Sequence, residues 1–421
     1  MKYMQSNNDR PHIAVIGAGA AGLLAAGTAL SFGAHVTLFD QNKTPGKKVL
    51  ITGKGRCNVT NECDLQEFLS NVPKNSRFLY AALSAFSPED TVTLFTSLGV
   101  PLKTERGKRV FPVSDKAADI VSALKKHAKD AEFISEKVTK ILAEENKVIG
   151  LRTDKDYFFD AVVLATGGKS YPLTGSDGSG YALAASLGHT VTKLSPSLIP
   201  LEAAGMLCKE LQGLSLRNIG FKICERTSEK TLYTDFGEMM FTHFGITGPV
   251  VISASAHLID KDISSLDAVI DLKPALDEKT LDKRLISDFT KYKNRDFLNA
   301  LSDLLPQKLI EPIVRISGID PRKKVNAITR EERTSLLKNL KALRIPLRGT
   351  RPISEAIVTS GGISVKEINP KTMMSKLCKD LYFAGEIIDV DAYTGGFNLQ
   401  IAFSTGYLAA EHAAIRNEDE T

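Results

Sequence analysis

Three glycines and one acidic residue near the start of the chain have the types and the spacing that bind a dinucleotide. Gly17, Gly19 and Gly22 follow an apolar run at 13–16, and Asp40 stands 18 residues after the last of them. In such a pattern the first glycine makes a tight turn, the second lets the backbone approach a pyrophosphate, and the third lets helix and strand pack closely. The acid accepts a hydrogen bond from a ribose hydroxyl. These residues therefore predict a site for an adenine dinucleotide.

The elements that must position these residues lie in the same stretch. The run at 13–16 predicts a strand, the apolar spacing at 23–32 predicts a helix, and the run at 36–39 predicts a second strand that ends at Asp40. The N-terminus of the helix offers unpaired N–H groups to an anion. Because strand, turn, helix, strand and acid occur in this order, we interpret the stretch as a Rossmann unit and not as a purely structural turn.

The length and the composition set the class of protein. A chain of 421 residues has room for two or three domains, and its 43% hydrophobic and 24% charged residues exclude disorder as the main state. The formal charge of +5 is small against 54 basic and 49 acidic side chains. The charge therefore indicates no particular partner, and nucleic acid is not expected as one.

The sequence favours a reducing, cytoplasmic setting. Residues 1–11 lack the apolar core of a signal peptide, and no run of about 18 apolar residues indicates a membrane span. Five cysteines at 57, 63, 208, 224 and 378, an odd and scattered set, fit free thiols better than a disulfide framework. Cys57 and Cys63 are separated by five residues and do not match CxxC, so we interpret them as thiols without a redox role.

Two basic segments come next. The loop at 45–61 mixes glycines with Lys47, Lys48 and Arg56, whose charges would attract an anionic ligand that the backbone approaches closely. The segment 103–112 carries three cations around a glycine and is typical of a hairpin. For both segments the alternative is charge that faces solvent.

The middle of the chain changes character twice. The apolar strand at 160–165 ends in Thr166, Gly167 and a further glycine, where the backbone would meet the cofactor a second time. A glycine-rich helix start at 175–180 has no strand directly before it and no acid at the right distance after it, so we reject a second, nicotinamide-binding unit. Short strand-like runs at 191–274 predict an antiparallel, barrel-like region, and 277–343 reads as a small helical insert.

The predicted catalytic residue lies in the barrel-like region. His243 falls within 237–249, just before a helix start at Thr247 and Pro249. It would be a proton donor in a substrate pocket. The alternative is a histidine that holds a turn by hydrogen bonds.

The chain ends with a strand and a long helix. The strand at 381–389 contains Gly385, and the glycines at 395 and 396 open the final helix, which we expect at 401–414. Such a helix start points its N–H groups and the positive end of its dipole at whatever precedes it. In a flavoprotein that target is the ring edge where negative charge collects on reduction.

Taken together, these motifs resemble a bacterial flavoprotein family, the aminoacetone oxidase-like and bile-acid-inducible (3-dehydro-bile acid) reductase-like proteins. The segments that carry the resemblance are 17–22, 53–61, 165–168, 241–249, 385–386 and 395–398, and the match runs from residue 12 to about 412. The resemblance implies an enzyme with one noncovalent FAD in a glutathione-reductase-like Rossmann domain, with the barrel and the helical insert on the substrate side. Phe397 stands where the family usually has tyrosine, and 391–393 replaces a stretch that often contains glycine.

The resemblance also implies cofactor contacts and a domain division. The positions that it assigns to FAD are Gly17, Gly19, Ala20, Gly22, Asp40, Lys47, Lys48, Gly55, Val138, Thr166, Gly167, Gly385, Asp389, Gly396 and Asn398, to which we add Arg56 and Phe397. No metal ligand is predicted. The expected segments are 1–190 and 363–421 for the FAD domain, 191–276 and 344–362 for the barrel, and 277–343 for the helices.

Three functions stay open at this point. The first is a reductase that passes hydride from NAD(P)H, as transient donor, through the flavin to an activated C=C bond of a small organic or steroid-like substrate. The second is an oxidase of a small amine or ketone that uses O2. The third is a flavoprotein that acts in RNA modification or as a scaffold. The sequence gives no indication of the oligomeric state.

Overall fold

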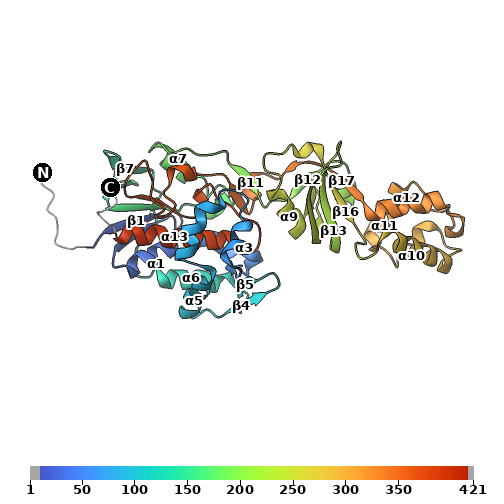
Figure 1. Ribbon diagram of the computed structural model, residues 1–421, viewed down its shortest axis with the longest axis horizontal. Helices are drawn as coiled ribbons and strands as arrows, with labels where there is room; N and C mark the ends of the chain where they lie inside the picture. Colours follow the sequence, from blue (N-terminus) through green and yellow to red (C-terminus); the bar gives the residue numbers. More distant parts are fainter. Residues whose placement is uncertain (1–9, 416–421) are drawn as a thin grey trace. The chain divides into compact units, whose positions relative to one another are not determined.

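The computed structural model describes residues 10–415, and the chain divides into two compact units (Figure 1). One unit is formed by Met1–Ser197 and Ile353–Thr421, and the other by Leu198–Pro352. Residues 1–9, most of the polar stretch that lacks a signal-peptide core in the sequence, lie outside the described residues, as do the outer ends of the predicted FAD segments. No helix within 10–415 is long and apolar enough to cross a bilayer.

A five-stranded parallel sheet organises the first unit. Its strand order is β19-β10-β1-β2-β6, with β1 at the centre, and every neighbouring pair is parallel. The strands are β1 (His12–Ile16), β2 (His35–Phe39), β6 (Glu132–Ile134), β10 (Ala161–Leu164) and β19 (Leu381–Phe383). Because ligands bind beyond the carboxyl ends of strands in such sheets, the glycine motifs after β1, β10 and β19 meet at one edge.

Two helices pack on this sheet and on each other. They are α1 (Ala20–Ser31) and α13 (Phe397–Ile415), which lie side by side in Figure 1. A Cβ at Gly406 would stand 2.6 Å from the carbonyl oxygen of Ala21, so the two helices approach at backbone distance only because residue 406 is glycine. The final helix begins at Phe397, four residues before the start that the sequence predicts.

Smaller elements surround the sheet. The helices are α2 (Lys47–Ile51), α3 (Leu65–Ser70), α4 (Tyr80–Ala85), α5 (Pro88–Ser97), α6 (Ala117–His127) and α7 (Ser179–Ala185). The antiparallel pieces are β3 (Thr60–Asn61) with β4 (Leu102–Glu105) and β5 (Arg109–Pro112), β7 (Lys140–Glu144) with β8 (Lys147–Arg152) and β9 (Asp156–Phe158), and β11 (Ser195–Ser197) with β18 (Val358–Ser360). The predicted hairpin at 103–112 is the β4–β5 pair.

The second unit is a closed antiparallel barrel with inserted helices. The strand order is β12-β15-β14-β13-β16-β17, and pairing of β12 with β17 closes it. The strands are β12 (Leu201–Ala203), β13 (Ser215–Glu225), β14 (Thr231–Phe241), β15 (Gly245–Thr247), β16 (Leu266–Asp271) and β17 (Leu343–Thr350), and the helices are α8 (Leu207–Glu210), α9 (Pro249–Ala256), α10 (Glu278–Lys291), α11 (Gln307–Ser317) and α12 (Arg330–Lys341). Alternate residues of β17 are buried, as a half-buried strand requires. The parallel sheet, the barrel and the helices inserted between β16 and β17 confirm the predicted fold class.

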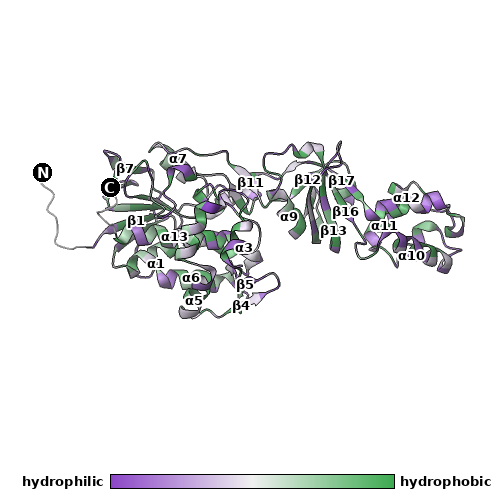
Figure 2. Ribbon diagram, in the orientation of Figure 1, coloured by the Kyte–Doolittle hydropathy of each residue, from purple (hydrophilic) through white to green (hydrophobic). Residues whose placement is uncertain are grey.

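Each unit has its own hydrophobic core. Figure 2 shows hydrophobic residues along β1 and hydrophilic segments on the outer helices α10 and α12. The units join at Ser197 and at Ile353, whereas the predicted barrel segments begin at 191 and end at 362. The reason is that β11 pairs with β18, which keeps both strands in the first unit. The finer division into FAD, barrel and helical segments stays a prediction.

Candidate functional site

The turn between β1 and α1 has the geometry that its glycines predict. Gly17 has a φ of +103°, and a Cβ there would stand 2.5 Å from the carbonyl oxygen of Ala165. A Cβ at Gly22 would stand 1.8 Å from the carbonyl oxygen of Gly17, so neither position accepts a side chain. Gly19, which precedes Ala20 at the helix start, faces open space within 4 Å. Tight packing behind the turn and open space in front of it are what a pyrophosphate site requires.

Asp40 closes this turn from the end of β2. Its Oδ2 accepts a hydrogen bond from the backbone N–H of Ala18 at 2.7 Å, and its Oδ1 accepts from the backbone and side-chain nitrogens of Asn42 at 2.7 and 3.0 Å. Lys47 donates to Oδ1 of Asn42 at 2.7 Å. A carboxylate has about four acceptor positions, so Asp40 keeps capacity for a ribose hydroxyl. Its predicted role as the ribose ligand stays a prediction.

Lys48 joins three segments that are far apart in the sequence. Its Nζ donates to Oγ of Ser170 at 2.7 Å and to Oε2 of Glu386 at 2.6 Å. The other oxygen of Glu386 accepts from the Ser170 hydroxyl at 2.9 Å and from the backbone N–H of Thr359 at 2.8 Å. The ion pair thus fixes α2 against the turns after β10 and β19. No role was predicted for Ser170, and Glu386 was predicted only as part of the motif at 385–386.

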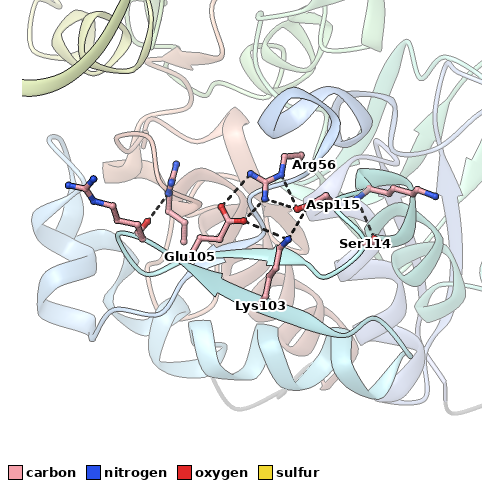
Figure 3. Close-up of polar contacts among 8 residues, drawn as sticks. Arg56, Lys103, Glu105, Ser114 and Asp115 are labelled. Carbon is pink, nitrogen blue, oxygen red and sulfur yellow. Dashed lines mark hydrogen bonds and ion pairs between the residues drawn. The ribbon is translucent and has the colours of Figure 1, made fainter. Parts of the chain in front are cut away.

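Arg56 is engaged by two carboxylates of the chain (Figure 3). Its Nε donates to Oδ1 of Asp115 at 2.9 Å, its Nη atoms bond to Glu105, and its guanidinium lies 4.2 Å from the ring centroid of Phe111. Lys103 also donates to Asp115, at 2.8 Å. These bonds raise the pKa of Arg56 and lower the pKa of both carboxyl groups. Arg56 therefore anchors the β4–β5 hairpin, and its predicted contact with the cofactor stays a prediction.

The edge between β10 and α7 holds buried hydroxyls that lack partners. Oγ1 of Thr166, Oγ of Ser176 and the hydroxyl of Tyr181 have no hydrogen-bond partner among the described residues. Gly167, between β10 and these groups, has a φ of +74°. Burial raises the pKa of Tyr181, so its phenol stays protonated. The glycine-rich helix start at 175–180 was rejected as a nicotinamide-binding unit. It is nevertheless the sequence signal that could have indicated Ser176 and Tyr181.

The glycines at the C-terminal end of the sheet are required by close packing. Gly385 has a φ of +76°, and a Cβ there would stand 2.8 Å from Cβ of Ala21 on α1. Gly396 has a φ of +100°, and a Cβ there would stand 2.3 Å from the carbonyl oxygen of Thr60 on β3. The start of α13 is therefore seated directly against β3.

The next two predicted contacts have side chains that bond within the protein. Asn398 accepts from the backbone N–H of Ala392 at 2.9 Å and donates to the carbonyl oxygen of the same residue at 2.7 Å. Phe397 is buried and packs edge-on against Phe68, with ring centroids 5.1 Å apart. These residues hold the loop before α13 in shape, and their contacts with the cofactor stay predictions.

Two buried carboxyl groups lie on this loop. Asp389 is 3% exposed and pairs with Lys74 at 2.7 Å. Asp391 is 1% exposed, and its Oδ2 accepts from Oγ of Ser197 at 2.8 Å, whereas its Oδ1 has no partner within residues 10–415. Burial raises the pKa of Asp391, which favours its neutral form.

The remaining predicted residues lie apart from these motifs in the sequence. Val138 is buried between β6 and β7 of the first unit. His243 is in the second unit, exposed, with its ring edge-on to Phe244. Its turn is closed by Thr242, whose N–H donates to the carbonyl oxygen of Gly245 and whose hydroxyl accepts from the N–H of that glycine. The role of His243 as proton donor stays a prediction.

The five cysteines are free and buried. Burial raises the pKa of Cys57 to about 12 and that of Cys63 to about 11. The raised pKa values disfavour the thiolate, which is the nucleophilic form, and the absence of a redox role for Cys57 and Cys63 stays a prediction.

The first unit as a whole fits a bound dinucleotide. Buried polar groups are almost always hydrogen-bonded, so a group of unpaired ones marks a place that a ligand completes. The unpaired atoms near the glycine motifs are Oδ1 of Asn58, Oγ1 of Thr166, Oγ of Ser176, the Tyr181 hydroxyl and Oδ1 of Asp391. Gly55, with a φ of +85°, faces open space as Gly19 does. Within 10–415 no group of acidic, histidine and cysteine side chains could hold a metal ion.

Comparison with known proteins identifies related chains. Residues 11–412 match the family described as the HI0933-like protein Rossmann domain. The 3-dehydro-bile acid delta(4,6)-reductase of Clostridium scindens is 32% identical over 417 residues, which cover 96% of this chain and 99% of the relative. The ribosomal RNA dihydrouridine synthase of Escherichia coli is 28% identical over 403 residues, which cover 94% of this chain and 96% of the relative.

A solved structure shares the fold. The 3-ketosteroid delta1-dehydrogenase of Sterolibacterium denitrificans superimposes with a TM-score of 0.54 at 12% identity, covering 97% of this chain and all of that one. At this identity the likeness concerns the fold alone.

Proposed function

The chain belongs to the HI0933-like Rossmann family of FAD-dependent oxidoreductases, and from this premise we propose that it reduces a C=C bond conjugated to a carbonyl group. The family match confirms the resemblance drawn from the motifs. FAD, held noncovalently, supplies the two-electron exchange between NAD(P)H as transient donor and a small organic or steroid-like acceptor.

One observation carries this proposal. The relative named as a 3-dehydro-bile acid delta(4,6)-reductase matches almost the whole of both chains, so the catalytic and the substrate-side segments are both included. Its name describes reduction of C=C bonds in a 3-oxo compound. A carbonyl conjugated with a double bond makes the far carbon electrophilic, which is the property a hydride donor needs.

The residues of this chain bind and orient the reactants. The N–H groups at the start of α1 would hold the pyrophosphate of FAD, and Asp40 would accept a hydrogen bond from its ribose. The start of α13 is fixed against β3 by Gly396, and the positive end of its dipole would stabilise negative charge on a flavin bound before it. Reduction also requires a proton at the second carbon, for which His243 remains the predicted donor.

A second candidate is reduction of a uracil base in RNA. It is favoured by the whole-length match to a ribosomal RNA dihydrouridine synthase. The double bond of uracil is also conjugated to a carbonyl, so both candidates share one chemistry and differ in the size of the acceptor. Tight RNA retention that falls steeply with salt would identify this candidate.

The test is anaerobic stopped-flow spectroscopy of the flavin. The oxidised enzyme is mixed with NADH, NADPH or simple amines, and the enzyme reduced by NAD(P)H is then mixed with cyclic enones, steroid enones or uridine-containing RNA. We expect NAD(P)H to bleach the flavin and an enone to restore its colour without O2. Free FAD under the same conditions is the control. Bleaching by an amine, with reoxidation only by O2, would replace the proposal with an oxidase.

A further inference from the structure

The β4–β5 hairpin carries two arginines that the protein does not neutralise. Its lysines are paired, Lys103 with Asp115 at 2.8 Å and Lys108 with Glu67 at 2.5 Å. Arg106 and Arg109 are exposed and have no carboxylate within ion-pair distance in the described part of the chain. Nε of Arg109 donates to the carbonyl oxygen of Arg106 at 3.0 Å, and its guanidinium lies 5.8 Å from the ring centroid of Phe111, contacts that leave its charge without a counter-ion within residues 10–415.

This hairpin tip is tied to the start of α13. Asn61 of β3 stands opposite Arg109 in the strand register. The side-chain nitrogen of Asn61 donates to the carbonyl oxygen of Gly107 at the tip and to that of Gly395 before α13, both at 3.0 Å. Paired strands lie about 4.8 Å apart, so the tip is one strand away from the helix start. The backbone of the hairpin tip that carries the two arginines therefore lies beside the C-terminal glycine motif.

The positive charges of the hairpin arginines and of the start of α13 attract the same kind of ligand. The positive end of the α13 dipole and the guanidinium groups of Arg106 and Arg109 have the same sign and no acidic partner at the tip. Arginine presents a planar fork of donors that matches a carboxylate or a phosphate. The lysines of this hairpin each have an acidic partner, and its arginines have none in the described part of the chain. Two guanidinium groups are therefore available to an anionic ligand.

We infer that Arg106 and Arg109 bind an anionic group, a carboxylate or a phosphate, on a molecule that reacts at this site. This inference rests on the proposed function, and it specifies that the enzyme selects a reactant with an anionic group. The anion belongs either to the acceptor or to the nicotinamide nucleotide. Arg106 and Arg109 are thus specificity-determining residues, and they take no part in the exchange of electrons.

The first arm of the test uses a matched pair of acceptors, a cyclohexenone with a butanoate side chain and its neutral N-methylamide. Exposed charge pairs contribute up to about fivefold in affinity each, so we expect Arg106→Gln with Arg109→Gln to lower kcat/KM for the carboxylate by about 5- to 25-fold. The amide should be reduced as by wild type. Added salt should reduce the ratio of kcat/KM between wild type and the double variant for the carboxylate, because salt screens exposed charges. Arg106→Lys with Arg109→Lys should restore part of the lost kcat/KM for the carboxylate. Lys125→Gln on α6 removes a positive charge elsewhere and is the matched control.

The second arm compares NADPH with NADH in anaerobic flavin reduction by the same variants. A loss confined to NADPH would assign the anion to the nucleotide phosphate and support the inference. A third measurement needs no turnover, because the saturated carboxylate analogue is titrated into the oxidised enzyme and the shift of the flavin absorbance is followed. If the double variant keeps wild-type values in all three measurements, the inference is wrong. If wild type reduces neither enone, the proposed function fails, and the titration still decides the inference.

Discussion

Replacing Asp40 with alanine separates the two tasks that its carboxylate performs. One task is visible in the structure, where Asp40 accepts from the N–H of Ala18 and from Asn42 and so ties β2 to the glycine turn. The other is the predicted hydrogen bond to a ribose hydroxyl of FAD. We expect Asp40→Ala to weaken FAD retention and to destabilise the apoprotein, while the flavin chemistry of the reconstituted enzyme stays close to wild type.

The magnitudes follow from the bonds that are lost. A charge-assisted hydrogen bond to ribose contributes roughly 1.5–3 kcal/mol, which corresponds to ~10- to 150-fold in the Kd for FAD. Ala18 is 1% exposed, so its N–H loses its acceptor without gaining water. An unsatisfied buried donor costs about 1–3 kcal/mol in the free energy of unfolding. Equilibrium dialysis with FAD measures the first effect, and urea unfolding of the apoprotein measures the second.

Asn42→Ala is the matched control. It removes the side-chain bond that Asn42 makes to Asp40 and leaves the carboxylate in place, so the Kd for FAD should stay within about threefold of wild type. If Asp40→Ala holds FAD as tightly as wild type, Asp40 is not the ribose ligand. If saturating FAD does not restore the rate of flavin reduction, the assumption that Asp40 lies far from the reacting ring is wrong.

Further expected outcomes concern the cofactor, the thiols, the core and pH. Purified protein should be yellow, and denaturing precipitation should release one FAD per chain; a covalent adduct would contradict the noncovalent site. Cys57→Ser and Cys63→Ser should keep flavin reduction by NAD(P)H within a few-fold of wild type, and loss of a charge-transfer band in either variant would reveal a redox role. Gln400→Leu should lower the free energy of unfolding by about 2–5 kcal/mol, because Gln400 is fully buried and the hydroxyls of Thr60 and Thr91 lose their shared acceptor; urea unfolding with an unchanged m-value would measure it. Burial lowers the pKa of His12 below 6.5 in the folded state, so stability should be unaffected above that pH and fall below it, where the unfolded chain takes up the proton first; His12→Gln should flatten this decline between pH 7.5 and 5.5.

Elements whose signals are local could be predicted from the amino-acid sequence. Gly17 and Gly22 predicted the turn because a φ of +103° favours glycine and because a Cβ at residue 22 would stand 1.8 Å from the carbonyl oxygen of Gly17. The strand runs and the helical spacing around them predicted β1, α1 and β2 because burial on a parallel sheet demands continuous apolar strands. The short strand-like runs at 191–274 predicted the barrel, because a small antiparallel barrel is built from many short strands. Each of these signals needs only a few neighbouring residues.

The pairing of distant side chains became visible only in the folded chain. Lys48 bonds to Glu386 across 338 residues, and Arg56 bonds to Glu105 and Asp115 across 49 and 59 residues. In the sequence Lys48 and Arg56 are equivalent cations of one basic loop, because charge and spacing carry no information about a distant partner. The order of strands in the sheet brings the loops together at one edge, and there it pairs Lys48 and Arg56 with carboxylates and leaves Arg106 without one. The physical reason is that a charged side chain reaches only a few ångströms, so its partner is set by the packing of the backbone and not by the residue itself.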